Sequence, residues 1–133
     1  MKRISSILIG ITFILFACHK DENEPDTNNC IFYQQAPAKY VNIPATGHVN
    51  QNVPLKIYFS CFNGCGEFGS IEKSDEGNTK IFIIIAKYEG CICSQDCPTR
   101  QTIYNFKTTL PGTYFLKFLI YDNNYIVDTL VIY

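Results

Sequence analysis

Apolar and polar residues alternate along several short segments in the last hundred or so positions of this chain. In residues 53–61, apolar side chains occupy every second position, and in residues 114–120 the alternate positions Tyr114, Leu116, Phe118 and Ile120 are expected to face the core. A period of two is typical of a strand with one face in a core and one toward solvent. No stretch of ten or more residues beyond position 30 shows a helical stripe. The pattern therefore predicts an all-β domain.

Gly, Pro, Asn and Asp residues divide this part of the chain into seven predicted strands. They are expected at residues 40–43, 53–61, 68–74, 79–88, 102–108, 113–121 and 125–133. Residues 81–85 are apolar without alternation, which indicates a central strand or one with both faces covered. Seven short strands favour an immunoglobulin-like antiparallel β-sandwich, in which Tyr114 is a candidate for a tyrosine corner.

The first residues have the features of an export signal. Lys2 and Arg3 precede an apolar run over residues 7–16, which is too short for a membrane span of about 20 residues. Leu15-Phe16-Ala17-Cys18 resembles the lipobox at which bacterial signal peptidase cuts before an acylated cysteine. The resemblance implies a signal peptide over residues 1–17 and a lipid anchor on Cys18, which holds stably to a membrane with two or more acyl chains.

Residues 18–29 are polar and acidic, and we expect them to form a flexible stalk because they offer no apolar surface to bury. Within them, Lys20-Asp21-Glu22 resembles the signal that sends Bacteroidota lipoproteins to the outer face of the outer membrane. The alternative is an ordinary solvated linker. Residues 30–133, the predicted globular domain, carry eight basic and eight acidic residues. This balance gives no electrostatic basis for binding nucleic acid.

The chain has seven cysteines, and assigning Cys18 to lipid leaves six. Thiols in a small exported domain indicate disulfides, because the compartment is oxidising and the core is modest. Their pairing stays open, although a direct Cys91–Cys93 bridge is sterically poor. The six predicted disulfide cysteines are Cys30, Cys61, Cys65, Cys91, Cys93 and Cys97.

Strand parity predicts where these cysteines lie. If consecutive strands are antiparallel, the loops after the second and fourth strands emerge at one end of the sandwich, together with Cys30 and the turn at residues 122–124. All six cysteines then lie at one pole, and two long loops are tied into a rigid tip. Such a tip serves either stability alone or recognition, since rigid loops bind with less entropic loss.

Sequence features argue against catalysis and against a cofactor. No Gly-x-Ser-x-Gly elbow and no phosphate-binding glycine loop occur, and His48 is the only histidine after position 19. The scattered acids are more simply read as solvated charges. A thiolate metal site, with copper(I) as the ion, is a minor alternative for the cysteines. We therefore predict a non-enzyme with no cofactor and no bound metal.

Binding is the remaining class of function, and two sets of side chains are candidates. Tyr58, Phe115, Leu119 and Tyr121 are predicted to point outward, with Ile103 beside them, and exposed apolar patches often mark interfaces. Phe62 and Phe68 are expected in or beside the cysteine loops.

Motifs within the domain extend the resemblance suggested by the lipobox. They are Asn63-Gly64-Cys65-Gly66, Glu89-Gly90-Cys91-Ile92-Cys93 and Pro111-Gly112-Thr113-Tyr114. The chain resembles small immunoglobulin-like outer-membrane lipoproteins of Bacteroidota type. This implies a surface-anchored binding or accessory module with a protein or glycan ligand and the cysteine pole as its working end. The alternative is a structural subunit of a larger envelope complex that packs through the aromatic face.

Overall fold

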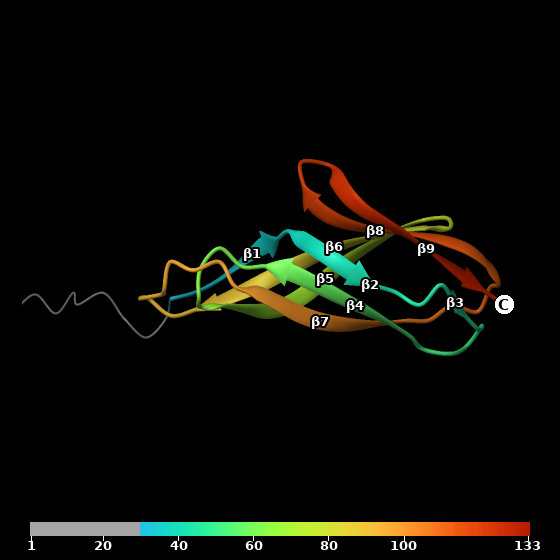
Figure 1. The fold of residues 1–133 in the computed structure, drawn as a ribbon, viewed down its shortest axis with the longest axis horizontal. Helices are drawn as coiled ribbons and strands as arrows, with labels where there is room; N and C mark the ends of the chain where they lie inside the picture. The colour runs from blue at the N-terminus through green and yellow to red at the C-terminus, as the bar shows by residue number, and fades with distance from the viewer. Residues whose placement is uncertain (1–29) are drawn as a thin grey trace, which may run out of the picture.

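The computed structural model describes residues 30–133, which fold into nine strands and no helix. The predicted signal peptide (1–17), the lipidated Cys18 and the predicted stalk (18–29) lie outside the described residues. The strands form two facing sheets (Figure 1), so the predicted all-β sandwich is confirmed. No helix long and apolar enough to cross a membrane occurs among residues 30–133.

The larger sheet is organised around β6 (Thr79–Glu89). On one side β6 pairs with β5 (Gly66–Glu76), and on the other it pairs with β1 (Ile31–Ala36) and then β8 (Gly112–Tyr121). The sheet continues through β9 (Asn124–Ile132) to β3 (Thr46–Gly47). The smaller sheet has the order β2 (Ala38–Asn42), β4 (Val53–Ser60) and β7 (Thr99–Phe106). The β6–β8 and β3–β9 pairs are parallel, whereas every other pair in the described part is antiparallel.

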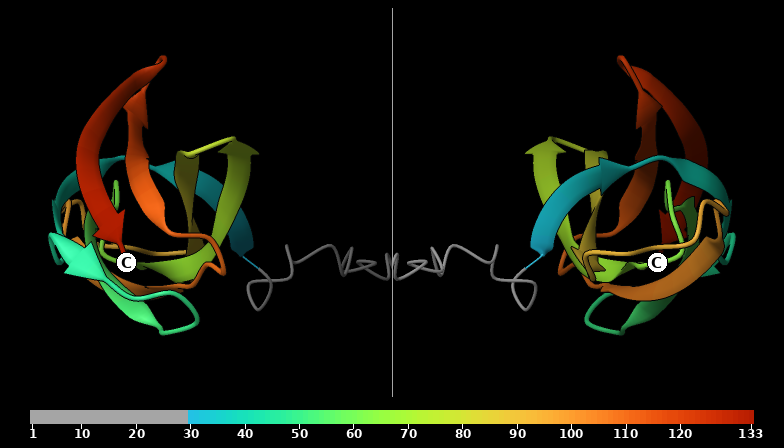
Figure 2. Two further views of the ribbon diagram at one scale, coloured as in Figure 1. Left: turned by 90° about the vertical axis from the view of Figure 1, so that its right-hand side faces the viewer. Right: turned by 90° about the vertical axis from the view of Figure 1, so that its left-hand side faces the viewer.

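One segment contributes an edge to both sheets. Only Pro37 separates β1, in the larger sheet, from β2, in the smaller one. Proline has no N–H for a ladder, which suits a point where the chain leaves one sheet for the other. Figure 2 shows this segment arching from one layer to the other, and Ala36 and Ala38 on either side of the crossing are buried.

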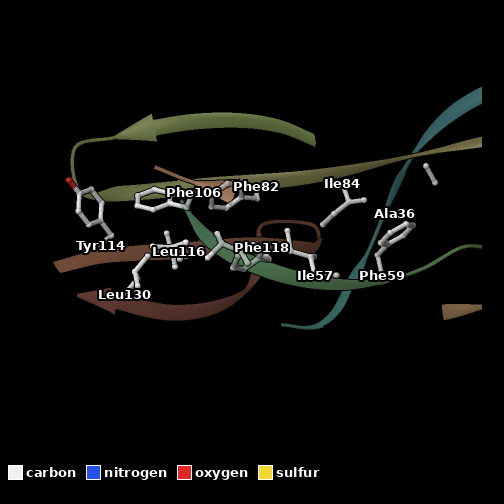
Figure 3. Close-up of a cluster of buried hydrophobic side chains, with 14 of the residues drawn as sticks. Ala36, Ile57, Phe59, Phe82, Ile84, Phe106, Tyr114, Leu116, Phe118 and Leu130 are labelled. Carbon is white, nitrogen blue, oxygen red and sulfur yellow. The ribbon is translucent and has the colours of Figure 1, made fainter. Parts of the chain in front are cut away.

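The core fills the space between the two sheets (Figure 3) and comes from the alternating positions. The predicted inward residues of β4 are all buried: Val53, Leu55, Ile57, Phe59 and, just beyond the strand, Cys61. Phe82 stacks on Phe118 with ring centroids 5.0 Å apart. In β6, Phe82 and Ile84 are fully buried, whereas Ile81, Ile83 and Ile85 are half-buried on the other face. This fits the central position predicted for the strand.

The structure differs from the prediction at two strands and one turn. β1 and β3 are not among the seven predicted strands, because they are defined by pairing with β6 and β9 rather than by a local pattern. The β8–β9 turn has positive φ angles at Asp122 and Asn123, as a tight hairpin turn requires. Contrary to expectation, this turn does not join the cysteine loops. β8 pairs with β6 only up to Phe118, and the hairpin then diverges (Figure 1).

Candidate functional site

Three segments meet at one end of the sandwich, which we call the cysteine pole: the chain before β1, the β4–β5 loop and the β6–β7 loop (Figure 1). A disulfide between Cys30 and Cys91 links the first segment to the third. A second disulfide, Cys65–Cys93, links the two loops. The predicted sandwich with disulfides at one end is therefore confirmed.

Hydrogen bonds reinforce the contact between the two loops. The Gly64 N–H donates to the Ser94 carbonyl at 3.0 Å. From β7, the Arg100 guanidinium donates to the carbonyls of Gly66 (2.9 Å) and Gly64 (3.3 Å), and it pairs with the Glu67 carboxylate at 3.0 Å. The single Arg100 guanidinium group thus makes three contacts, which hold the start of β5 and the residues before it against β7.

Cys61 and Cys97 are thiols rather than members of a third disulfide, so the structure differs from the prediction for these two residues. Cys61 is buried directly after β4, whereas Cys97 is exposed in the β6–β7 loop. Sequence spacing did not distinguish these two from the other four, because pairing depends on which loops lie side by side.

An aromatic stack crosses the cysteine pole. Tyr88, at 1% exposure, packs against Phe32 and Phe62, with ring centroids 4.8 and 4.1 Å away, and the rings of those two residues lie 5.8 Å from each other. Its hydroxyl accepts the Phe62 N–H at 3.2 Å. Because Phe32 and Phe62 stay partly exposed, the stack runs from the core to the surface.

A cleft of about 280 Å³ opens beside this stack. Its walls are Gln34, Gln35, Pro37, Ser60, Cys61, Phe62, Tyr88 and Cys97. The aromatic rings and proline make the cleft mainly apolar, while two amides and one hydroxyl supply hydrogen-bonding groups. This mixture is typical of a small ligand pocket. Phe62 was predicted here, but Gln34 and Gln35 were missed because β1 was not recognised as a strand.

The buried thiol of the cleft wall, Cys61, loses its proton less readily than an ordinary cysteine. Burial raises the pKa of Cys61, opposed by its hydrogen bond with Tyr88 and by the charge of Arg100. Burial also raises the pKa of the Tyr88 hydroxyl. Both groups therefore stay protonated at neutral pH, whereas a catalytic cysteine needs a lowered pKa.

A second, larger cleft of about 420 Å³ lies away from the cysteines. Its lining includes Lys73 and Lys80, whose ammonium groups lie 3.8 and 3.5 Å from the Asp75 carboxylate, together with Lys107. Lys80 also lies over the Tyr114 ring, 5.8 Å from the centroid. One carboxylate shared between two lysines is typical of a surface ion-pair network, which contributes little to stability.

The outward aromatic residues do not form one face, which corrects the predicted arrangement. Tyr58 lies on β4 of the smaller sheet, where it stacks on Tyr40 at 4.1 Å. Phe115 and Tyr121 lie on β8 of the larger sheet and are 46% and 62% exposed. The two groups therefore occupy the outer faces of different sheets.

Three further predicted residues are now placed. Ile103 is exposed on the smaller sheet opposite Lys56, so it belongs with Tyr58. Leu119, predicted outward, is buried, because the β8–β9 register shifts between Leu119 and Tyr121. Phe68 lies in β5, as the predicted strand over residues 68–74 implies, and is partly exposed, with its ring 6.3 Å from that of Phe59.

No cluster of three or more metal-ligating side chains occurs within residues 30–133. The minor metal alternative was proposed for five sulfurs, and those of Cys65, Cys91 and Cys93 are in disulfides, which counts against that alternative.

A family model described as "ORF11 beta-sandwich domain" matches residues 55–132, from within β4 to the end of β9. Neither a curated protein nor a solved structure matches the chain. The matched region contains five of the six domain cysteines and leaves out Cys30 and β1.

Proposed function

Because the chain belongs to the ORF11 beta-sandwich family, whose description names a fold and no reaction, we propose a function from the geometry of the cysteine pole. The protein is a surface-anchored lipoprotein that binds a ligand at this pole and catalyses no reaction. The observation that carries the proposal is the apolar cleft beside the aromatic stack, at the end where two disulfides cross-link three segments.

Rigidity at the cysteine pole supports binding over stability alone. A loop that is fixed before it meets a ligand loses less conformational entropy on binding. If the disulfides served stability alone, we would expect the apolar side chains around them to be buried. Phe32 and Phe62 are instead 42% and 46% exposed, and Ile92 is 96% exposed. Exposed apolar groups on a rigid frame are typical of a recognition surface.

The size and chemistry of the cleft limit what it accepts. At about 280 Å³ it is slightly smaller than pockets for drug-sized ligands, which begin at about 300 Å³. It suits one apolar side chain of a protein partner or one sugar ring stacked on Phe62. The amide of Gln34, on the same face of β1 as the buried Ala36, can hydrogen-bond the polar rim of such a group.

Two phenylalanines allow a matched test, because Phe62 at the cysteine pole and Phe115 on the larger sheet are both 46% exposed. The protein is screened against a glycan array and, by crosslinking, against envelope proteins, and the affinity of any saturable ligand is measured for both variants. We expect Phe62→Ala to weaken binding about tenfold or more, which corresponds to about 1.4 kcal/mol, and Phe115→Ala to leave it unchanged.

The reverse result would overturn the proposal. Loss of binding in Phe115→Ala alone would favour the alternative of a structural subunit that packs through a sheet face. The absence of saturable binding in either screen would contradict a binding module altogether.

Anchoring is a separate part of the proposal and rests on Leu15-Phe16-Ala17-Cys18. Metabolic labelling with palmitate is expected to label the wild-type protein and not Cys18→Ser, and external protease is expected to degrade the wild-type protein on intact cells. Labelling that persists in Cys18→Ser would contradict the lipid anchor. Protection from protease would contradict display at the surface.

A further inference from the structure

Two thiols remain at the cysteine pole, and both line the same cleft. We propose that Cys61 and Cys97 form a redox-exchangeable third disulfide across this cleft. The bond forms by thiol–disulfide exchange with a small disulfide of the glutathione class, and it narrows the cleft.

Backbone contacts bring the two residues together. The Cys61 N–H donates to the Pro98 carbonyl at 3.0 Å, which continues the β4–β7 pairing beyond Ser60 and Thr99. Cys97 is therefore next to the residue paired with Cys61. Disulfides join Cα atoms about 4.4–6.8 Å apart, and adjacent strands are about 4.8 Å apart, so one bond can span this gap.

A side-chain contact keeps the Cys97 sulfur beside the residue that follows Cys61. In a regular ladder, Cys97 would point away from Cys61, but it lies in the irregular β6–β7 loop. Its thiol donates to the Phe62 carbonyl at 3.5 Å, one residue after Cys61. Cys61, Cys97 and Tyr88 all line the same cleft.

The different exposure of the two thiols sets the order of the steps. The exposed Cys97 thiolate attacks oxidised glutathione, forming a Cys97–glutathione mixed disulfide and releasing one glutathione thiolate. The Cys61 thiol then loses its proton to solvent, and its sulfur attacks Cys97, which releases the second glutathione. Two thiols are thus oxidised and one glutathione disulfide is reduced. The second step is slow, because Cys61 is buried and its ionisation is disfavoured.

A bond between these two walls would draw the β6–β7 loop against Phe62 and reduce the opening of the cleft. The effect of this bond on ligand binding rests on the proposed function, whereas formation of the bond does not. The test therefore detects the Cys61–Cys97 bond itself.

The full-length protein is treated with oxidised glutathione, the remaining thiols are alkylated under denaturing conditions, and intact mass and non-reduced peptides are measured. We expect the wild-type protein to lose both alkylatable domain thiols, to carry no glutathione, and to yield a Cys61–Cys97 linked peptide. We expect Cys61→Ala to retain one glutathione on Cys97. Cys97→Ser is expected to keep Cys61 reduced, because its thiol is buried.

Other patterns in the wild-type protein would overturn the proposal. These are stable glutathione on Cys97 with Cys61 still alkylated, two unmodified thiols after prolonged treatment, or a bond from either residue to another cysteine. Because the wild-type measurement needs no variant, a failure of Cys61→Ala to fold does not affect it. If the bond forms but ligand affinity is unchanged, only the narrowing of the cleft is overturned.

Discussion

The two ends of the sandwich are held by different interactions. At the end opposite the cysteines, the Tyr114 hydroxyl bonds to Thr108 and to the Leu110 carbonyl, both at 2.8 Å, as in the predicted tyrosine corner. Backbone bonds such as Val49 N–H to Tyr133 O, at 2.9 Å, complete that end. At the cysteine pole, the β6–β7 loop over residues 90–98 has no regular structure, and two disulfides hold it.

The difference shows where covalent links are useful in a small domain. At the opposite end, backbone hydrogen bonds between neighbouring segments, such as Asn50 N–H to the Thr108 carbonyl at 2.8 Å, hold the turns without a covalent link. A long loop without a ladder gains little from its own contacts, and a disulfide compensates by restricting the unfolded chain. Irregular loops that are nevertheless fixed are well suited to carry a binding surface.

The largest expected effect comes from removing either disulfide. Cys30–Cys91 closes 61 residues and Cys65–Cys93 closes 28, so the chain-entropy model gives losses of about 4 and about 3.5 kcal/mol. Urea unfolding of Cys30→Ser/Cys91→Ser and Cys65→Ser/Cys93→Ser measures both losses. If each double variant lost less than about 1 kcal/mol of unfolding free energy, the two disulfides would not be what stabilises the cysteine pole.

Glycines at the two ends give a matched comparison of backbone constraint. Gly90, at the cysteine pole, has φ +139°, and a Cβ there would lie 2.9 Å from the Cys65 sulfur. Gly77, in the β5–β6 turn, has φ +61°, and a Cβ added there would meet no atom within 4 Å. We expect Gly90→Ala to lower the free energy of unfolding by about 3 kcal/mol and Gly77→Ala by about 1 kcal/mol. Equal losses in urea unfolding would contradict the tighter constraint at the pole.

The tyrosine corner should contribute a smaller amount. Tyr114→Phe removes two hydrogen bonds of about 1 kcal/mol each, one of them to a backbone carbonyl. We expect a loss of about 1–2 kcal/mol by urea unfolding. Tyr133→Phe at the same end is the control, since its ring is 65% exposed, and it should change stability by less than about 0.5 kcal/mol. If Tyr114→Phe and Tyr133→Phe lowered stability equally, the hydrogen bonds of the tyrosine corner would not stabilise this end of the domain.

The smallest expected effect is a pH dependence that originates at the cysteine pole. Burial raises the pKa of Cys61 above its ordinary 9.0 and that of Tyr88 above 10.0. The unfolded chain therefore releases these protons at lower pH than the folded one, so stability falls as pH rises from about 9 through the folded pKa values. Urea midpoints at pH 8 and pH 10 should show this fall, with a smaller one in Cys61→Ala. If the urea midpoint of Cys61→Ala fell by the same amount between pH 8 and pH 10, the pH dependence would not come from Cys61.

Local patterns predicted most of the fold. The alternation of Val53 to Cys61 identified β4, and the apolar run of residues 81–85 identified the central strand. β1 was missed because Ile31 to Gln35 are exposed and do not alternate, so only pairing with β6 makes them a strand. β3 is two residues long and has no local signal at all.

The candidate site depends more heavily on contacts between distant residues. Strand parity correctly placed the cysteines at one pole, yet spacing could not show that Cys61 and Cys97 are left as thiols. Tyr58 and Phe115 were both correctly placed outward. Alternation does not say which sheet a strand joins, so their separation on two faces needed the topology. The cleft combines residues of β1, β4 and β6 with Pro37 and with residues of the β4–β5 and β6–β7 loops, and no single segment carries its signature.

The central claim is that Cys30–Cys91 and Cys65–Cys93 bind three segments into one rigid pole. Peptide mapping of the protein, alkylated before digestion and never reduced, tests this most directly. We predict linked peptides for both pairs in every preparation, with Cys61 and Cys97 either alkylated or joined to each other. Cys30 or Cys65 found alkylated, or joined to any other cysteine, would contradict the account.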